Sequence, residues 1–176
     1  MILADGPSHV SFLIDFGLAE RFHNLTTYLH HSYSTDHPII GTLPFTSVNG
    51  HRGHAQAHHD DLESLAYTII YSGCGELPWT HFCSHKAILW KKLSITTEEL
   101  YWGLPAPFCD FITYVHSLGF EEKPDYQHLH LILSLCSEID TDTNQPSKHQ
   151  QKSTFLIPSY SILLHLIPLI LGVRRE

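Results

Sequence analysis

The sequence is poor in basic residues. Ten lysines and arginines stand against 18 aspartates and glutamates, so the formal net charge at pH 7 is −8. A surface that binds nucleic acid needs clustered lysine and arginine to neutralise the phosphates. Because the charge balance here is the reverse, we expect protein substrates or partner proteins and no nucleic-acid partner.

Cysteines at metal or redox spacing are also missing. The chain has four cysteines, and no two of them form a Cys-x-x-Cys motif. Scattered cysteines are typical of reduced thiols in a cytosolic or nuclear protein rather than of a disulfide framework or a zinc site. Residues 1–10 lack the basic flank and apolar run of a signal peptide, which agrees with that expectation.

Histidine, by contrast, is abundant, with 16 residues. The run His58-His59-Asp60-Asp61 and the pair formed by His128 and His130 contain metal-binding side chains. Neither has the i, i+4 helical pair with a third ligand that makes a zinc motif persuasive. We expect these histidines to form a polar surface rather than a metal centre.

Apolar residues recur at helical spacing through the middle of the chain. From Asp60 they fall at i, i+3, i+4, i+7 and i+8, which predicts a helix over residues 60–72 that is buried on most of its surface. Capping residues, an N-terminal proline and further apolar stripes predict more helices. These begin at Ser84, Thr96, Pro107 and Asp125. The predicted fold class is therefore mainly α.

Three segments lack this helical pattern. Residues 23–38 are polar and rich in threonine, serine and histidine, which predicts a mobile loop. Residues 138–154 have the composition of a solvated linker. Residues 155–176 form a tail whose first part, up to Val173, is almost entirely apolar.

The apolar part of this tail is just long enough to cross a bilayer, which requires about twenty residues. Two prolines and His165 interrupt it. These interruptions favour an extension that packs against the rest of the chain in a cytoplasmic or nuclear protein. A membrane tail anchor over residues 155–173 is the alternative.

One short motif near the start carries chemistry. Residues 13–19 read Leu-Ile-Asp-Phe-Gly-Leu-Ala, a predicted strand that leads into Asp-Phe-Gly. Protein kinases use this element to hold magnesium. The surrounding apolar residues and the motifs that follow argue against a chance occurrence.

Further motifs follow in a fixed order. Residues 41–49 read Gly-Thr-Leu-Pro-Phe-Thr-Ser-Val-Asn, residues 60–67 read Asp-Asp-Leu-Glu-Ser-Leu-Ala-Tyr, and residues 77–79 read Leu-Pro-Trp. A further block, residues 117–126, reads Ser-Leu-Gly-Phe-Glu-Glu-Lys-Pro-Asp-Tyr. In order and spacing, residues 11–137 resemble the casein kinase I family of serine/threonine protein kinases.

The resemblance implies the large C-terminal lobe of the protein-kinase-like fold over residues 11–137. Residues 1–10 are then an N-terminal remnant, and the activation segment covers about residues 15–49. Asp15 corresponds to the magnesium ligand of the family, Phe16 to the apolar plug behind it and Gly17 to the flexible point of the motif. A carboxylate is the hard oxygen donor that magnesium prefers, so the implied cofactors are ATP and Mg²⁺.

The resemblance also marks an activation-segment and scaffold set. Its members are Gly41, Thr42, Ser47, Asn49, Asp60 and Asp61. Thr42 corresponds to a threonine that hydrogen-bonds the catalytic aspartate, and Asp61 to the aspartate that anchors the catalytic loop. If Asp61 is buried it needs other donors, and if it is solvated it suits the first turn of a helix.

The other parts of a phosphoryl-transfer site are not found in the sequence. A Gly-x-Gly-x-x-Gly loop, a Val-Ala-x-Lys strand and a His-Arg-Asp loop are all missing, and residues 1–10 are too few to hold them. We therefore expect no complete catalytic set, no tight binding of ATP and no transfer by this polypeptide alone. The alternatives are a non-catalytic, pseudokinase-type interaction module and a longer active product that contains the missing lobe.

The sequence also departs from the family where substrates are recognised. Pro44 replaces an arginine that follows Gly-Thr in the family, and His58 and His59 replace a pair of arginines. A basic residue of the family is lost near Phe82 and Cys83 as well. Since neutral histidine and proline cannot clamp phosphate as arginine does, we expect altered handling of phosphorylated substrates.

Overall fold

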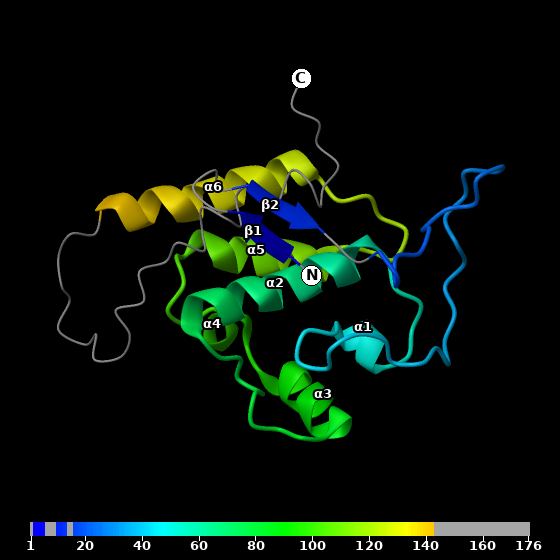
Figure 1. Cartoon of the computed structure of the whole chain (residues 1–176), viewed down its shortest axis with the longest axis horizontal. Coiled ribbons are helices and arrows are strands. Elements are labelled where there is room, and N and C mark those ends of the chain that lie inside the picture. The colour runs from blue at the N-terminus through cyan, green and yellow to red at the C-terminus, as the bar shows by residue number, and fades with distance from the viewer. Residues whose placement is uncertain (1, 6–9, 14–15, 143–176) are drawn as a thin grey trace.

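The structure, a computed structural model, describes residues 2–5, 10–13 and 16–142. Over these ranges the fold is mainly helical, as predicted, with one small two-stranded sheet (Figure 1). The strands are β1 (Ile2–Asp5) and β2 (Val10–Leu13). The helices are α1 (Val48–His51), α2 (His58–Cys74), α3 (His85–Ser94), α4 (Thr97–Leu100), α5 (Pro107–Ser117) and α6 (Tyr126–Asp142).

The two strands pair antiparallel. Ile2 lies opposite Leu13, and Asp5 lies opposite Val10. The strand predicted before Asp-Phe-Gly is therefore present as β2, and its partner β1 lies within residues 1–10. The sequence pattern did not predict this pairing.

Helix α2 is the central helix of the fold. It contacts α5 and α1, and α5 in turn lies along α6 (Figure 1). The prediction of a deeply buried helix here is confirmed, because Leu62, Ile69 and Ile70 are each at most 2% exposed. The helix ends at Gly75, whose φ of 82° is left-handed and whose N–H donates to the Tyr71 carbonyl.

Helices α3, α4 and α6 begin at the residues that capping chemistry predicted. The hydroxyl of Ser84 accepts a hydrogen bond from the N–H of Ala87 at the start of α3, and Thr96 forms a capping box with Glu99 at the start of α4. The Asp125 carboxylate accepts from two amides of α6. Helix α6 continues to Asp142, beyond the start of the linker predicted at residue 138.

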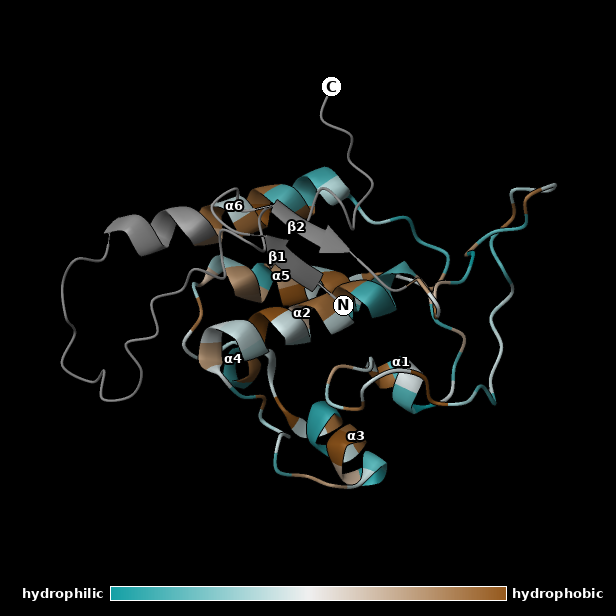
Figure 2. Ribbon diagram, viewed as in Figure 1, coloured by the Kyte–Doolittle hydropathy of each residue, from teal (hydrophilic) through white to brown (hydrophobic). Residues whose placement is uncertain are grey.

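The core lies where α2, α5 and α6 face one another. Figure 2 shows hydrophobic stretches on these helices and hydrophilic residues at the beginnings of α2 and α6. Trp79 follows α2, is fully buried, and its indole Nε1–H donates to the Pro44 carbonyl at 2.8 Å. Its ring packs edge-on against Tyr67 with centroids 4.9 Å apart. The hydrogen bond to Pro44 thus ties the chain before α1 to the helical core.

Residues 16–47 form an extended segment that projects from the helices (Figure 1). Within it, the backbone contains turns and an isolated bridge between His23 and His30, but no helix or regular strand. Its exposed position fits the predicted loop, and its mobility stays a prediction.

Two backbone hydrogen bonds attach this segment to the loop before α2. The N–H of His37 donates to the Gly53 carbonyl, and the N–H of Ala55 donates to the Ser34 carbonyl, both at 2.9 Å. Gly53 has a φ of 69°, and a Cβ there would lie 2.7 Å from the His37 carbonyl oxygen. Only glycine fits this close approach without a shift of the backbone.

Within the described ranges, every helix is too short or too polar to cross a membrane. The apolar tail over residues 155–176, for which a membrane anchor was the alternative, lies outside the described residues. Most of the predicted linker lies outside them as well.

Candidate functional site

The residues of the Asp-Phe-Gly motif are only partly described. Asp15 lies outside the described residues. Phe16 is 66% exposed, and Gly17 is exposed as well. The packing of Phe16 behind a magnesium site, which the resemblance implies, is not seen here.

Gly41 and Thr42 lie on the surface at the end of the extended segment. The backbone carbonyl of Thr42 accepts hydrogen bonds from the amides of Phe45 and Thr46, at 2.9 and 3.2 Å. Thr42 therefore closes a turn that leads toward α1. The proposed bond from its side chain to a catalytic aspartate stays a prediction.

Ser47 and Asp60 form a buried hydrogen-bonded pair between α1 and α2. The Ser47 hydroxyl donates to Asp60 Oδ1 at 2.7 Å and accepts from the N–H of Gly50, so it also caps α1. The other carboxylate oxygen, Oδ2, accepts from the N–H of Ala57 at 2.8 Å. Both oxygens of a fully buried carboxylate thus have donors, which offsets the cost of burying the charge.

The structure assigns different surroundings to the two neighbouring aspartates. The role that the resemblance gives to Asp61, anchoring the catalytic loop, stays a prediction. Of the two residues, Asp60 is buried and hydrogen-bonded, whereas Asp61 is exposed. Desolvation by nearby protein atoms, followed by the charge of Asp60, raises the pKa of Asp61, and His59 opposes this shift. In the described residues, Asp60 is therefore the anchor between α1 and α2.

Asp61 lines a groove between the extended segment and the start of α2. The groove has a volume of about 560 Å³, and its wall includes Arg21, Phe22, His30, His58 and Phe120. The Phe22 ring lies 4.3 Å from the His58 ring, and the His30 ring 4.9 Å from the Phe120 ring, measured between centroids. Aromatic packing therefore holds the segment against the helical body.

The groove contains imidazole nitrogens without hydrogen-bond partners. His30 Nε2 and His58 Nδ1 are buried and unpaired. Burial lowers the pKa of His58, and His30, His59 and Lys123 lower it further. The His58 ring is consequently disposed to be neutral at pH 7 and cannot replace a phosphate-binding arginine.

The cofactors that the resemblance implies, ATP and Mg²⁺, stay a prediction for this chain. Across residues 16–136, whose side chains are described, no three His, Cys, Asp or Glu side chains converge on a position suited to a metal ion. Among the residues that line the groove, Arg21 is the one permanent cation, and Glu20 and Asp61 are the carboxylates. A magnesium site would depend on Asp15 and on groups that the described residues do not supply.

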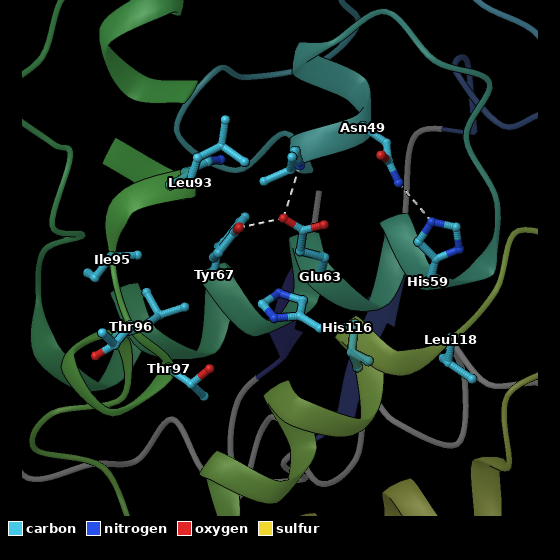
Figure 3. A pocket seen from close by; sticks show the side chains of 14 residues that line it. Asn49, His59, Glu63, Tyr67, Leu93, Ile95, Thr96, Thr97, His116 and Leu118 are labelled. Atoms are coloured by element: carbon cyan, nitrogen blue, oxygen red, sulfur yellow. Dashed lines mark hydrogen bonds between the residues drawn. The ribbon is translucent and has the colours of Figure 1, made fainter. Parts of the chain in front are cut away.

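A second pocket opens on the other side of the α1–α2 contact. Its volume is about 370 Å³, and residues of α1, α2, α3, α4 and α5 line it (Figure 3). At one side Asn49 Nδ2 lies 2.9 Å from His59 Nε2, which is itself 3.2 Å from the Asp60 carboxylate. Asn49, which sequence reasoning singled out, thus connects this pocket to the buried pair of Ser47 and Asp60.

Glu63 projects toward the same pocket from α2. It is buried, and its Oε1 accepts from the Val48 N–H at 3.0 Å and from the Tyr67 hydroxyl at 2.5 Å (Figure 3). Tyr67 keeps its proton, because burial and the Glu63 charge raise its pKa well above the usual value. Glu63 is a second link between α1 and α2.

Lys92 is the buried cation of this region and is only 7% exposed. Its Nζ donates to the Thr46 carbonyl at 2.5 Å and lies 4.2 Å from the centre of the Tyr67 ring and 4.7 Å from that of Trp79. Burial lowers the pKa of Lys92 to about 7, against an opposing effect of Glu63. The amine is therefore substantially neutral at physiological pH.

His51 lies close to Lys92 and is also buried. Its Nε2–H donates to the Leu43 carbonyl at 3.0 Å. Burial and the charge of Lys92 lower the pKa of His51 to about 4. A neutral His51 thus accompanies the lysine at neutral pH.

Sequence reasoning did not identify Glu63 and Lys92 as buried. One signal was available for Lys92, because it follows Ile88 by four positions and therefore shares the inner face of α3. No model of a known protein family matches this chain. The function therefore has to be argued from its own residues.

Proposed function

We propose that this chain is the large lobe of a casein kinase I-like serine/threonine protein kinase, a family that transfers phosphate from ATP to protein hydroxyls. The observation that carries the proposal is the pair of Ser47 and Asp60. These residues belong to two separate motifs of the resemblance, and they meet in one buried hydrogen bond. A kinase large lobe requires such a connection between the end of its activation segment and its central helix.

The other scaffold residues support the same proposal. Asn49 contacts His59, and the backbone of Val48 binds Glu63, so α1 is held on α2 at three points. Asp61 faces the groove beside the extended segment. In the proposed lobe, Asp61 would receive the catalytic loop, whose backbone amides would neutralise the exposed carboxylate.

The proposal includes a negative expectation for these 176 residues. Phosphoryl transfer depends on positioned cations around the phosphates and on an aspartate that accepts the hydroxyl proton. The sequence supplies neither a glycine-rich loop nor a His-Arg-Asp loop. The polypeptide alone therefore neither binds ATP–Mg²⁺ tightly nor phosphorylates casein.

A two-part experiment tests the proposal. The first part titrates the chain with ATP–Mg²⁺ by calorimetry and measures transfer of radiolabelled phosphate to casein. The second part joins to its N-terminus the small lobe and catalytic loop of a casein kinase I family member. The joined protein should phosphorylate casein, Asp15→Asn should abolish that activity, and Asp110→Asn on the exposed face of α5 should leave it intact.

Two results would contradict the proposal. Micromolar ATP affinity of the unjoined chain would contradict the expectation that this chain alone does not bind ATP–Mg²⁺ tightly. A joined protein that folds but transfers no phosphate would contradict the kinase assignment itself.

A non-catalytic interaction module is the second candidate. The observation that favours it is the group of large apolar side chains exposed along the extended segment. They are Phe16, Leu18, Phe22, Leu25, Tyr28, Leu29 and Tyr33. Apolar side chains gathered on a surface mark protein interaction sites.

The doubly substituted variant Leu25→Ser and Leu29→Ser tests this candidate. A docking role predicts that the variant keeps the melting temperature of the parent chain but loses partners recovered by affinity purification. Leu135→Ser, at an exposed position of α6, is the control. Equal recovery of the same partners by all three proteins would exclude the segment as the docking surface.

A further inference from the structure

The groove between residues 16–40 and the start of α2 is lined by several imidazole rings. We propose that His58 makes this groove a pH-sensitive latch: a neutral His58 keeps residues 16–40 docked on the helical body, and a protonated His58 releases them. The inference goes beyond the proposed function and does not depend on it, because it uses only the contacts between the segment and the helical body.

The first argument is the position of His58 under the docked segment. The Phe22 ring packs edge-on against the His58 ring, with centroids 4.3 Å apart and an interplanar angle of 68°. His30, further along the segment, lies 6.3 Å from His58 and 4.9 Å from Phe120, again between centroids. His58 is therefore the residue of α2 on which two rings of the segment rest.

The second argument is that His58 lacks a partner for an added proton. Its Nδ1 is buried and has no hydrogen-bond partner among the described residues. Within the same residues, no carboxylate oxygen lies within 4.0 Å of either ring nitrogen. His58 is also the first residue of α2, where the positive end of the helix dipole disfavours a cation. A charged imidazolium here lacks the compensation that a buried charge needs.

The third argument comes from the groups that act on His58. Burial lowers the pKa of His58 most, and His30, His59 and Lys123 lower it further. These three reach the ring from the segment, from α2 and from the loop after α5. The Phe22 ring attracts an imidazolium, but burial is the larger influence, so the docked state favours the neutral ring.

The groove wall contains further titratable and charged groups. They are Glu20, Arg21, His31, His37, His54 and Asp61. Arg21 repels an imidazolium at His58, whereas the two carboxylates attract it. Because neither carboxylate is ion-paired with His58 in the described part of the chain, the influences that lower its pKa prevail.

Two of these histidines have contacts that tolerate protonation. The Ser34 hydroxyl lies 2.8 Å from His37 Nε2, and the Tyr33 hydroxyl lies 2.9 Å from His54 Nδ1. A hydroxyl can donate to a neutral imidazole and accept from a charged one, so both hydrogen bonds can persist in acid. The acid-sensitive point of the docked segment is therefore His58.

Proton linkage gives the direction of the effect. Docking lowers the pKa of His58, whereas in the open state the ring is solvated and its pKa is near the ordinary value of 6.5. Below about pH 6.5 the open state therefore binds more protons, and docking weakens as pH falls toward the lowered pKa. The open population should increase at least about threefold between pH 7.5 and 5.5, and one proton limits the increase to about tenfold.

Hydrogen exchange of the full chain, followed by NMR, tests the proposal. The amides of His37 and Ala55 report on docking, because each donates a hydrogen bond between the segment and the loop before α2. Their protection factors are exchange rates relative to an unstructured peptide at the same pH. Both should fall at least about threefold between pH 7.5 and 5.5, in step with the open population.

A variant pair separates His58 from the other histidines. His58→Gln removes the titrating ring and should abolish most of this change in protection, whatever its effect on docking at pH 7.5. His81→Gln is the control, because that side chain is 89% exposed and lies outside the groove. It should preserve the pH dependence of the parent chain.

Three results would overturn the proposal. Constant protection of His37 and Ala55 between pH 7.5 and 5.5 would show that docking ignores the proton. Equal pH dependence in the parent chain and in His58→Gln would assign the effect to other groups. A ring-proton NMR titration of His58 in the folded chain should have its midpoint below 6.5, and a midpoint at or above this value would remove the driving force.

Discussion

Three acidic residues of α2 lie close together in sequence but have different partners. Asp60 is fully buried and bound by Ser47 and the Ala57 amide, Asp61 borders the groove, and Glu63 is bound by Tyr67. The contrast follows from the helical geometry, since each position points about 100° away from the last. One step along the chain thus separates a structural carboxylate from an accessible one.

Asp60→Asn should therefore destabilise the protein much more than Asp61→Asn. The amide keeps the size of the carboxylate but has only one acceptor oxygen. One of the two donors, the Ser47 hydroxyl or the Ala57 N–H, is then left without an acceptor. We expect a loss of about 1–3 kcal/mol for Asp60→Asn and less than about 0.5 kcal/mol for Asp61→Asn. Urea unfolding measures both, and equal losses would show that the two carboxylates share the anchoring role.

The pKa of Lys92 predicts a specific pH dependence of stability. Its folded-state pKa, about 7, lies below the ordinary value of 10.5, so between these values the unfolded chain binds more protons. The free energy of unfolding should consequently rise with pH, by about 1 kcal/mol per pH unit between roughly pH 7.5 and 9. Lys92→Met should remove this slope.

Lys86→Met is the matched control for Lys92→Met, because Lys86 is exposed on the same helix. Its unfolding should follow the pH dependence of the parent chain. The comparison is made by urea unfolding at several pH values. Identical slopes for the parent chain and Lys92→Met would mean that the buried amine keeps its proton.

Local sequence could not reveal the partners of these buried charges. Glu63 interrupts the apolar pattern of α2 and resembles a solvent-facing residue, and its burial depends on Val48, fifteen positions earlier. Lys92 depends on the Thr46 carbonyl, which is 46 positions away. Contacts between residues so far apart in the sequence form only in the packed fold. The spacing of apolar residues within one helix therefore cannot predict them.

At the scale of elements, the sequence predicted most of the helices. Apolar spacing located α2, and capping residues located the starts of α3, α4 and α6, because both signals act within a few positions of the chain. Helix α1 was not predicted. Its single turn has no apolar stripe, and it is held by contacts with α2 and α3.

Truncation of Ile69 tests the burial of α2. Ile69 is 1% exposed, so Ile69→Ala should leave a cavity and reduce the free energy of unfolding by about 2–4 kcal/mol. Ser72→Ala, on the exposed side of the same helix, should change it by less than about 0.5 kcal/mol. A small loss for Ile69→Ala would place α2 at the surface.

The whole molecule combines a packed helical body with the extended segment of residues 16–47. The body shares one apolar core, and the end of the segment, residues 43–47, is hydrogen-bonded to it. Most side chains of residues 16–40 are instead exposed, and their main attachments are two backbone bonds and the aromatic contacts of the groove. Opening of residues 16–40 should therefore cost far less than unfolding of the body.

Hydrogen exchange would detect this difference. Amides of residues 16–36 should exchange through local opening, at least about a thousandfold faster than the core amides of α2, which require global unfolding. Mass spectrometry of peptic fragments gives both rates in one experiment. Similar protection in the two regions would mean that the segment and the body unfold together.

The placement of the three tryptophans gives the protein a built-in optical reporter. Trp79 is fully buried, whereas Trp90 and Trp102 are 66% and 83% exposed. With Trp90→Phe and Trp102→Phe, fluorescence would come from Trp79 alone and should be blue-shifted and shielded from acrylamide quenching. Because the Lys92 amine lies 4.7 Å from that indole ring, the emission of this variant would respond to the charge of the amine in real time.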